Sequence, residues 1–396
     1  MWSRTNRCSV REHRHAVDRY RVWKHRYAPV PRKPGMLLAA AAAFLLAVGT
    51  LTGCSLYSGN GIGTANTEKN AEAANRTGLA FGESAGTENE NSGLATAENL
   101  IAVGVSQVGS ESVFRTANTE SLQRTFTRDN GYFLIFDNAR QKQENQIKAL
   151  RNFISQRVDY IVLSPLTEDG WDTVLLEAKE AGIPVILIDR RVDVEDESLY
   201  TAWVGSDFYL EGREAGRILE KTLAREHRED ETIRIVVLRG TDGSTAEIGR
   251  SRGFEEIAAQ HENWLLVESA DAEFTTAKGK EVMARMLKQY SDINVVISQN
   301  DDMTFGALEA MKEAGVTAGE HGDIRVISFD ATRSALELVQ QGVLTADIEC
   351  NPDQGAQVDE LIRKMREGKP APKLTFMPET VYTKENVAKA LESRAY

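Results

Sequence analysis

Acidic, amide and guanidinium side chains follow several apolar segments of the chain, at the point where each segment ends. These residues are Ser106, Asp137-Asn138, Ser164, Asp189-Arg190, Asn300-Asp301-Asp302 and Asp330. Such a set suits a ligand rich in hydroxyl groups, because a carboxylate accepts a hydrogen bond from one hydroxyl while a guanidinium donates to its neighbour. An aromatic face can cover the apolar C–H side of the same ligand. The sequence therefore predicts a site for a polyhydroxylated small molecule.

An acidic and a basic residue stand next to each other at Asp189-Arg190, directly after the apolar run 184–188. A surface turn could also carry such a pair. Burying either charge alone would be costly, whereas neighbouring opposite charges compensate one another. Because Arg191 adds a further cation here, we interpret the pair as part of the binding site.

Short apolar runs alternate with amphipathic stretches from residue 100 onward. The runs at 101–105, 132–136, 160–164, 184–189, 233–238, 294–298 and 324–329 are typical of buried strands. Between them, Ile147, Leu150 and Ile154 recur at spacings of three and four, which places them on one face of a helix. Single helices between strands require right-handed crossovers and parallel sheets.

The predicted strands fall into two groups, one from 100 to about 204 and another from about 232 onward. The segment 199–207 between them is extended and could cross from one group to the other. Ligands of doubly wound sheets lie beyond the carboxyl ends of the strands, which is where the polar residues stand. We therefore predict an α/β fold of two doubly wound lobes that present a polar rim.

Catalytic motifs are weak in this chain. Gly249-x-Ser251-x-Gly253 matches the letters of a nucleophile elbow, but an elbow must follow a strand directly. Here the preceding Ser244 begins a stretch typical of a helix start, and His261 and His321 have no evident partner. The sequence contains no Walker loop, no HExxH and no EF-hand loop. We therefore expect no enzyme and no catalytic residues.

The three cysteines, Cys8, Cys54 and Cys350, lie far apart and belong to no CxxC motif. Histidine and cysteine never cluster at the spacing of zinc ligands. We therefore predict neither a disulfide framework nor a metal site, and no cofactor.

The net charge of −12 is unevenly distributed along the 396 residues. Residues 1–35 carry +8, which leaves −20 for the remainder of the chain. Nucleic-acid binding needs a positive surface to replace phosphate counterions. The acidic body of the protein therefore excludes DNA and RNA as expected partners.

A leader segment occupies the first part of the chain. Arg32 and Lys33 precede an uncharged run at 36–51, which is short for a membrane span but suits the apolar region of a signal peptide. The run ends in Leu51-Thr-Gly-Cys54, which resembles a bacterial lipobox and implies cleavage before Cys54 and lipidation of its sulfur. The alternative is a membrane anchor that happens to precede a cysteine. We predict a signal region at 1–53, whose first part is either a basic extension or, if translation starts near Met36, not translated. We also predict a flexible linker at 54–99, because this segment is rich in Gly, Ser, Thr, Asn, Glu and Ala.

Several longer stretches carry a family resemblance. They are VSQVGSES at 105–112, QKQENQIK at 141–148, Ile188-Asp-Arg190, FTTAKGKEV at 274–282 and Asn300-Asp-Asp-Met303. With them, residues 100–396 resemble the ribose-type periplasmic sugar-binding proteins of ABC uptake systems, most of all the galactofuranose-binding group.

The resemblance implies a set of ligand-binding residues. They are Glu111, Ser112, Val113, Phe114, Arg115, Asp189, Arg190, Arg250, Asn300 and Asp330. Glu111, Ser112 and Arg115 correspond to the loop after the first strand, where the family holds the sugar ring. The galactofuranose-binding group has Gly-Trp where this chain has Val113-Phe114, so the aromatic wall is smaller here.

The resemblance also implies an architecture and a role. Lobe one would comprise 100–205 and 352–375, and lobe two 206–351 and 376–396, joined by three segments that form a hinge (a type I periplasmic binding protein). Cys350 would be a free thiol near the cleft. A monomer, lipid-anchored on the extracytoplasmic side of the membrane in the cell envelope, would capture a monosaccharide such as galactofuranose, a related furanose or a pentose. It would deliver this sugar to an ABC transporter permease.

Transport has three alternatives. Sugar repressors share this fold but carry an N-terminal helix-turn-helix, and residues 1–99 have a lipobox and linker instead. A sensory receptor would use the same lobes to signal to a membrane kinase or chemoreceptor. An enzyme is the weakest alternative, because no catalytic motif fits its structural context.

Overall fold

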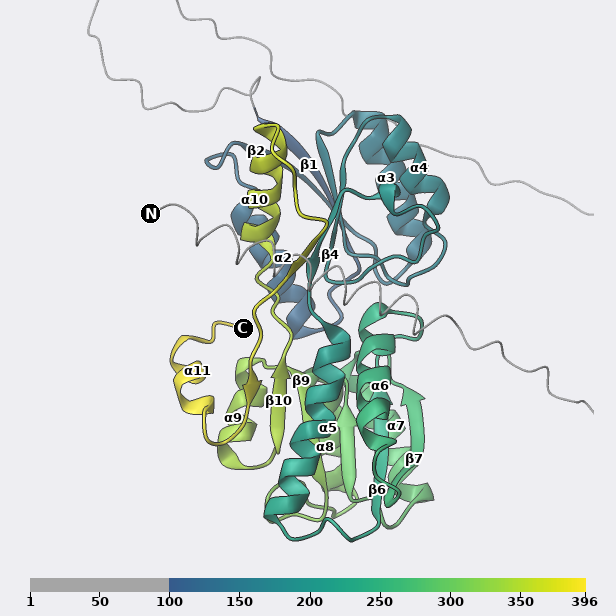
Figure 1. Ribbon diagram of the computed structural model, residues 1–396, viewed down its shortest axis with the longest axis vertical. Helices are drawn as coiled ribbons and strands as arrows, with labels where there is room; N and C mark the ends of the chain where they lie inside the picture. The colour runs from purple at the N-terminus through teal and green to yellow at the C-terminus, as the bar shows by residue number, and fades with distance from the viewer. Residues whose placement is uncertain (1–99) are drawn as a thin grey trace, which may run out of the picture. The chain divides into compact units, whose positions relative to one another are not determined.

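Two six-stranded sheets with helices on both faces make up residues 100–396, the part of the chain that the computed structural model describes (Figure 1). The predicted signal region 1–53, Cys54 and the linker 54–99 lie outside the described residues. No helix within 100–396 is long and apolar enough to cross a membrane.

Lobe one is built on the sheet order β11-β5-β4-β3-β1-β2, with all neighbours parallel. Its strands are β1 Ile101–Gln107, β2 Tyr132–Asn138, β3 Tyr160–Leu163, β4 Val185–Ile188, β5 Ala202–Gly205 and β11 Leu374–Phe376. Its helices are α2 Val113–Thr125, α3 Gln143–Gln156, α4 Asp172–Glu180, the short 3-10 helix Glu197–Leu199 and α10 Gly355–Arg366. Alternate residues of one strand face opposite layers: Ile161 and Leu163 share a core with α3 and α4, and Val162 shares one with α2 and α10.

Lobe two is built on the order β12-β10-β9-β8-β6-β7, in which only β12 is antiparallel to its neighbour. Its strands are β6 Ile233–Arg239, β7 Trp264–Asp271, β8 Val295–Ser298, β9 Arg325–Asp330, β10 Ala346–Glu349 and β12 Val381–Tyr382. Its helices are α5 Phe208–Arg225, α6 Thr245–Ala258, α7 Thr276–Gln289, α8 Asp301–Glu313, α9 Arg333–Gln341 and α11 Val387–Ser393. Helices α5 and α6 cover one face, and α7, α8 and α9 cover the other.

The two lobes share one topology. In chain order, the first five strands of each lobe take the spatial order second, first, third, fourth, fifth. The strand order reverses between β1 and β3 in lobe one and between β6 and β8 in lobe two, and ligands of such sheets bind beyond these points. The predicted fold of two doubly wound lobes is confirmed.

Three segments connect the lobes. The first leads from β5 to α5, the second from β10 to α10, and the third from β11 to β12. In Figure 1 the second and third run side by side between the lobes. The hinge therefore has the three segments that the sequence resemblance implies.

All seven strands predicted from apolar runs are present, but the structure adds five more. Three of these, β5, β10 and β11, are only three or four residues long, and β12 has two. The fifth, β7, is an edge strand whose Leu265 and Leu266 are exposed. It therefore has neither the regular alternation nor the continuous apolar run by which strands are recognised.

The Gly249-x-Ser251-x-Gly253 motif lies inside helix α6. Ser244 caps the helix, since its side chain accepts a hydrogen bond from the Glu247 amide. A Cβ on Gly253 would overlap the carbonyl oxygen of Tyr209 on helix α5. The glycines therefore let α5 and α6 pack closely, which explains the motif without a nucleophile.

Candidate functional site

A small cavity lies between the lobes, at the carboxyl ends of the strands. It is lined by Glu111, Ser112, Phe114, Arg115, Asp189, Arg190, Phe208, Ala246, Arg250, Phe274, Asn300, Asp330 and Cys350. Nine of the ten residues predicted for the site belong to this lining. The exception is Val113, which is 40% exposed.

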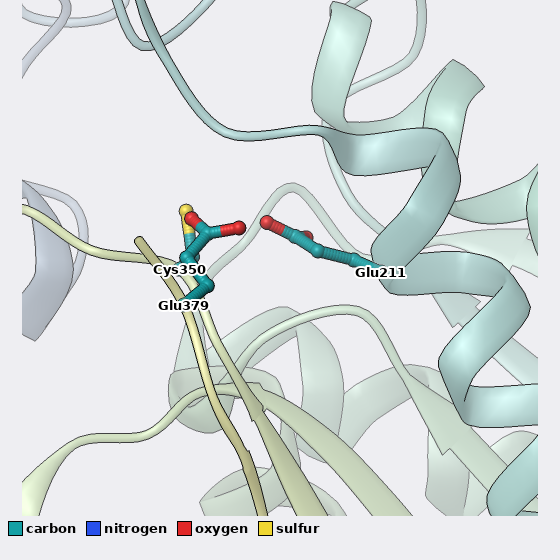
Figure 2. A group of neighbouring side chains, drawn as sticks. All are labelled: Glu211, Cys350 and Glu379. Carbon is teal, nitrogen blue, oxygen red and sulfur yellow. The ribbon is translucent and has the colours of Figure 1, made fainter. Parts of the chain in front are cut away.

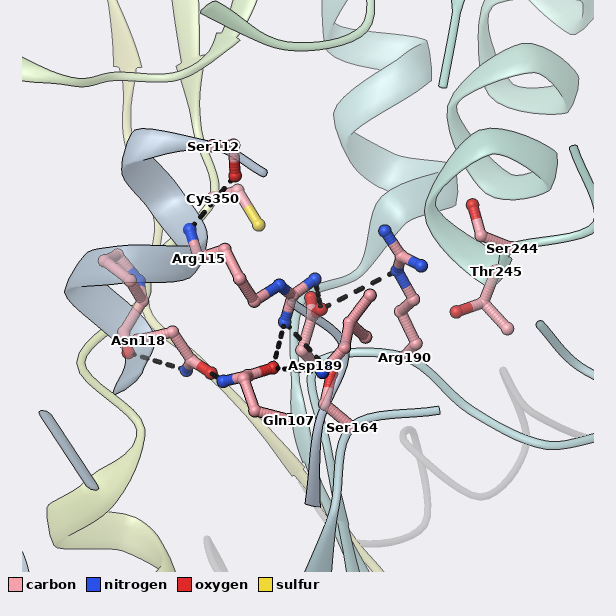
Figure 3. Close-up of polar contacts among 12 residues, drawn as sticks. Gln107, Ser112, Arg115, Asn118, Ser164, Asp189, Arg190, Ser244, Thr245 and Cys350 are labelled. Carbon is pink, nitrogen blue, oxygen red and sulfur yellow. Dashed lines mark hydrogen bonds and ion pairs between the residues drawn. The ribbon is translucent and has the colours of Figure 1, made fainter. Parts of the chain in front are cut away.

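Arg115 organises the lobe-one side of the cavity (Figure 3). Its guanidinium donates to Glu111 at 3.3 Å, Gln107 at 3.2 Å, Ser164 at 3.0 Å and Asp189 at 2.7 Å. Burial lowers the pKa of Arg115, but the carboxylates of Asp189 and Glu111 outweigh this effect and the pKa ends above its usual value. A guanidinium has five N–H donors, so one N–H at Nη2 is left for a ligand.

Arg190 is less completely paired. Its Nη1 donates to the Leu166 carbonyl at 2.8 Å, while its Nε is buried without a hydrogen-bond partner, 3.9 Å from Asp189. Burial and the neighbouring Arg115 lower the pKa of Arg190 to about 10. Only 3% of the residue is exposed, so Asp189-Arg190 is not a surface turn. A buried donor without a partner is costly, and a hydroxyl oxygen in the cavity would satisfy it.

Arg250 and Asp330 form the corresponding part of lobe two. Arg250 Nε lies 2.6 Å from Glu211 Oε2, and Arg250 Nη2 lies 3.5 Å from Asp330 Oδ1. Burial raises the pKa of Asp330 well above its usual value, although Arg250 opposes this. Asp330 also has a φ of +106°, a conformation that non-glycine residues rarely adopt. Such strain is typical of a functional position.

Asn300 caps helix α8 and also lines the cavity. It is the N-cap of α8, where its Oδ1 accepts from the Met303 amide at 2.9 Å. Its Nδ2 donates to the Phe274 carbonyl at 3.3 Å. The second N–H of the amide is left for a ligand.

Some polar residues at strand ends do not line the cavity. Ser106 is buried and its hydroxyl has no hydrogen-bond partner. Ser164 accepts a hydrogen bond from Arg115. Asp301 is fully buried and accepts from Ser328 at 2.6 Å and from the Thr332 amide at 2.8 Å. These residues therefore have structural roles that a strand-end pattern cannot distinguish from binding.

The sequence prediction missed the lining residues Phe208, Ala246 and Phe274, and it placed Cys350 near the cleft without a role in the site. Phe208 begins α5 directly after its cap, and Phe274 lies beneath the Arg190 guanidinium, 5.3 Å from it to the ring centre. With Phe114 they give the cavity aromatic side chains from both lobes. Phe274 begins the FTTAKGKEV stretch, which could have identified it.

Direct contacts hold the two lobes together around the cavity. The Val113 amide of lobe one donates to Asp302 of lobe two at 3.0 Å. The Arg191 amide donates to Thr245 at 3.1 Å, and the Glu168 amide donates to the Gly243 carbonyl at 3.0 Å. The structure therefore shows a closed form, and the backbone amide of Val113 is one of the groups that hold the lobes together.

Cys350 is a buried free thiol at the edge of the cavity, on the second connecting segment. It lies with Glu211 and Glu379, and one potential ligand atom of each lies within 4.8 Å of the others (Figure 2). Among residues 100–396 this is the one group of three or more Cys, His, Asp or Glu residues close enough to hold a metal ion.

Known proteins provide an independent comparison. The chain is 38% identical over 298 residues to the galactofuranose-binding protein YtfQ of Escherichia coli (strain K12), covering 74% of this chain and 91% of the relative. A crystal structure from Mycobacterium smegmatis in complex with β-D-fucofuranose is 40% identical, with a TM-score of 0.71, covering 74% of this chain and 95% of that one.

A second solved structure is the binding component of the arabinose ABC transporter from Shewanella sp. ANA-3, bound to α- and β-L-arabinofuranose. It is 40% identical, with a TM-score of 0.69, and covers 74% of this chain and 95% of that one. Residues 101–370 match the family described as "Periplasmic binding protein domain". The two-lobed fold, the cavity between the lobes and these relatives together show that the chain belongs to the periplasmic binding protein family.

Proposed function

We propose that the protein captures a monosaccharide in its furanose form, galactofuranose or a related furanose or pentose, and delivers it to an ABC transporter permease. The observation that carries this proposal is the cavity itself. It combines guanidinium, carboxylate and amide groups with aromatic side chains, and it is closed by both lobes.

The polar groups suit neighbouring hydroxyls. Arg190 Nε is buried without a partner, and one N–H of Arg115 and one of Asn300 are also unused. Asp189 and Asp330 offer carboxylate oxygens beside these donors. Each hydroxyl of a sugar is both a donor and an acceptor, so neighbouring hydroxyls can satisfy both kinds of group.

The close approach of the two lobes and the relatives favour one small ring. Direct contacts between the lobes, such as that between the Val113 amide and Asp302 at 3.0 Å, leave little space in the cavity. The relatives described above bind galactofuranose, β-D-fucofuranose and L-arabinofuranose, according to their names. We therefore infer the same class of ligand for this chain, bound by the nine predicted residues that line the cavity, while the Val113 amide holds the lobes together through Asp302.

The anchor and the delivery step complete the proposal. The lipobox at 51–54 supports lipidation of Cys54 and a position on the extracytoplasmic face of the membrane. A related binding component serves an ABC transporter, which supports a permease as the partner of this protein. We propose that the protein is a monomer and has no catalytic activity.

Thermal-shift screening of the purified protein tests the ligand class. D-galactose, D-fucose and L-arabinose are compared with D-glucose and myo-inositol, and a crystal structure of the best complex shows the ring form. We expect the largest stabilisation from the first group and a bound furanose. A tightly bound pyranose or inositol would overturn the furanose assignment, and no stabilisation by any of them would count against these monosaccharides as ligands.

A further inference from the structure

One buried cluster joins all three segments that connect the lobes. Ser206 comes from the first segment, Cys350 from the second and Glu379 from the third. The Ser206 hydroxyl donates to Glu379 Oε1 and lies 3.3 Å from Cys350 Sγ. The Asn351 amide donates to the same Glu379 oxygen at 3.2 Å. We call Ser206, Glu211, Cys350 and Glu379 the hinge cluster.

Glu211 links the hinge cluster to the sugar cavity. Its Oε2 lies 2.6 Å from Nε of Arg250, which lines the cavity. Its Oε1 is buried and has no hydrogen-bond partner, although only 2% of the residue is exposed. Figure 2 shows the carboxyl groups of Glu211 and Glu379 facing one another.

The charges of the hinge cluster do not balance if both carboxyls are ionised. Arg250 can compensate one of them, which leaves a second negative charge in a buried place. Burial, and then the nearby Glu211, raise the pKa of Glu379 to about 9. Burial also raises the pKa of Glu211 to about 7, against the effect of Arg250. Glu379, whose pKa is the higher of the two, therefore keeps its proton at neutral pH, while Arg250 at 2.6 Å favours the anionic form of Glu211.

Other titratable groups near the cluster do not supply the missing positive charge. They are Asp189, Asp207, Asp330, Cys350 and Tyr396. Burial raises the pKa of the Cys350 thiol well above its usual value, so the thiol stays neutral. A metal ion is less suited than a proton, because Arg250 already engages Glu211, and Ser206 and the Asn351 amide engage Glu379.

We propose that Glu379 carries a proton in the closed form and donates it to the unpaired Glu211 Oε1, so that closure around the sugar takes up one proton. This inference rests on the proposed function. Glu211 is then a positioning residue: it stays anionic and holds Arg250 in the cavity. Glu379 is partly exposed, so the proton can exchange with solvent. When the connecting segments rearrange and the lobes separate, the two carboxyls gain water and Glu379 returns towards the usual pKa of Glu, about 4.3.

The sign of the pH effect follows from this difference. A carboxyl whose pKa is higher in the closed form stabilises that form fully below its open-form pKa. The stabilisation is lost as pH rises through the closed-form pKa, about 9. Sugar affinity therefore falls between about pH 5 and pH 9, by at most about tenfold per pH unit for one proton.

Isothermal titration calorimetry with D-galactose tests the proposal. Titrations of wild type at pH 7.5, in buffers of different ionisation enthalpy, should show uptake of about one proton per sugar. Glu379→Gln should show almost none, because the amide donates the hydrogen bond without a titrating proton. Its affinity should change little with pH and should exceed that of wild type at pH 8.5.

Two further variants complete the design. Glu211→Gln should lose both proton uptake and affinity, since Arg250 loses its anionic partner. Glu385→Gln is the matched control, because Glu385 follows on the same C-terminal segment but its side chain is 65% exposed. It should reproduce the wild-type profile.

The outcomes separate this inference from the proposed function. If wild type binds D-galactose without proton uptake, or if Glu379→Gln keeps the wild-type pH profile, the proton link is wrong and sugar binding stands. If EDTA weakens binding and Zn²⁺ restores it, the hinge cluster holds a metal ion and the proton link is also wrong. If none of the screened sugars binds wild type at any pH, the proposed function itself fails.

Discussion

Arg115 and Arg250 lie on corresponding helices of the two lobes. Each lies on the helix that follows the first strand of its sheet, and each pairs with the aspartate at the end of the fourth strand in chain order. The Arg115–Asp189 pair is 2.7 Å long and the Arg250–Asp330 pair 3.5 Å. Both aspartates have positive φ, +59° and +106°. The cavity is thus lined by the same structural element twice, once from each lobe.

Removing one of these aspartates should weaken sugar binding strongly. Asp189→Ala removes an acceptor and leaves Arg115 and Arg190 without their shared partner. We expect a loss of about 2–5 kcal/mol of binding free energy, roughly 30-fold or more in affinity. Calorimetry with D-galactose measures this loss of affinity. The control is Asp196→Ala, because the Asp196 side chain is 57% exposed. If the affinity of folded Asp189→Ala changed less than threefold, Asp189 would lie outside the site.

The aromatic wall should tolerate enlargement. Phe114 lines the cavity, and the sequence resemblance implies Trp at this position in the galactofuranose-binding group. Phe114→Trp should therefore strengthen D-galactose binding by up to about 1–3 kcal/mol or leave the affinity unchanged. Phe133→Trp, at an exposed position on lobe one, should have no effect. Substantial weakening by Phe114→Trp in calorimetry would contradict a furanose ligand of this kind.

The contact between Val113 and Asp302 should favour the closed form. Asp302→Ala removes the acceptor of the Val113 amide. Because one net hydrogen bond contributes about 0.5–1.5 kcal/mol, affinity should fall about 2- to 13-fold. Asp302→Asn keeps an acceptor and should bind nearly as wild type does. X-ray scattering with sugar should show more of the open form for the alanine variant; unchanged scattering and affinity would exclude a role in closure.

Close packing of α5 on α6 should be sensitive to a single methyl group. Gly253→Ala places a Cβ against the Tyr209 carbonyl, so the helices must separate, at a cost of about 1–3 kcal/mol in the free energy of unfolding. Urea denaturation measures this. Glu255→Ala, on the exposed face of the same helix, should change it by less than about 0.5 kcal/mol. Equal stability of the two variants would show that α5 and α6 can adjust.

The proposed lipid anchor is Cys54. Cys54→Ala should release the protein from the membrane or leave an uncleaved precursor, while its affinity for sugar stays unchanged. Membrane fractionation with labelled fatty acid measures both effects. Normal processing and lipid labelling of the variant would show that Cys54 is not the anchor.

The alternation of apolar runs and amphipathic stretches was sufficient to predict the two sheets and the polar residues at the carboxyl ends of their strands. Apolar runs such as 160–164 are continuous because their strands are buried on both faces. Asp189 and Asp330 were identifiable because they follow two such runs. The separation of cavity residues from supporting residues was not predictable, because Asp301 and Asp302 are neighbours yet one is a core acceptor and the other contacts the opposite lobe.

The hinge cluster could not be predicted from the sequence either. Ser206, Cys350 and Glu379 are far apart in the chain and stand in three short connections without periodicity. Their proximity is a result of the whole topology, since two sheets must each be completed by a late strand. Glu211 likewise occupies an ordinary helical position, and nothing local indicates that its carboxyl is buried.

The near-complete burial of the lining has a consequence for kinetics. Arg115, Asp189, Arg190 and Arg250 are each only 2–3% exposed, so we expect a ligand that contacts all four to be held until the lobes separate. The dissociation rate can then be no faster than the rate at which the lobes separate. Residence time would be governed by the hinge and by the contacts between lobes, and a permease that pulls the lobes apart could release even a tightly bound ligand quickly.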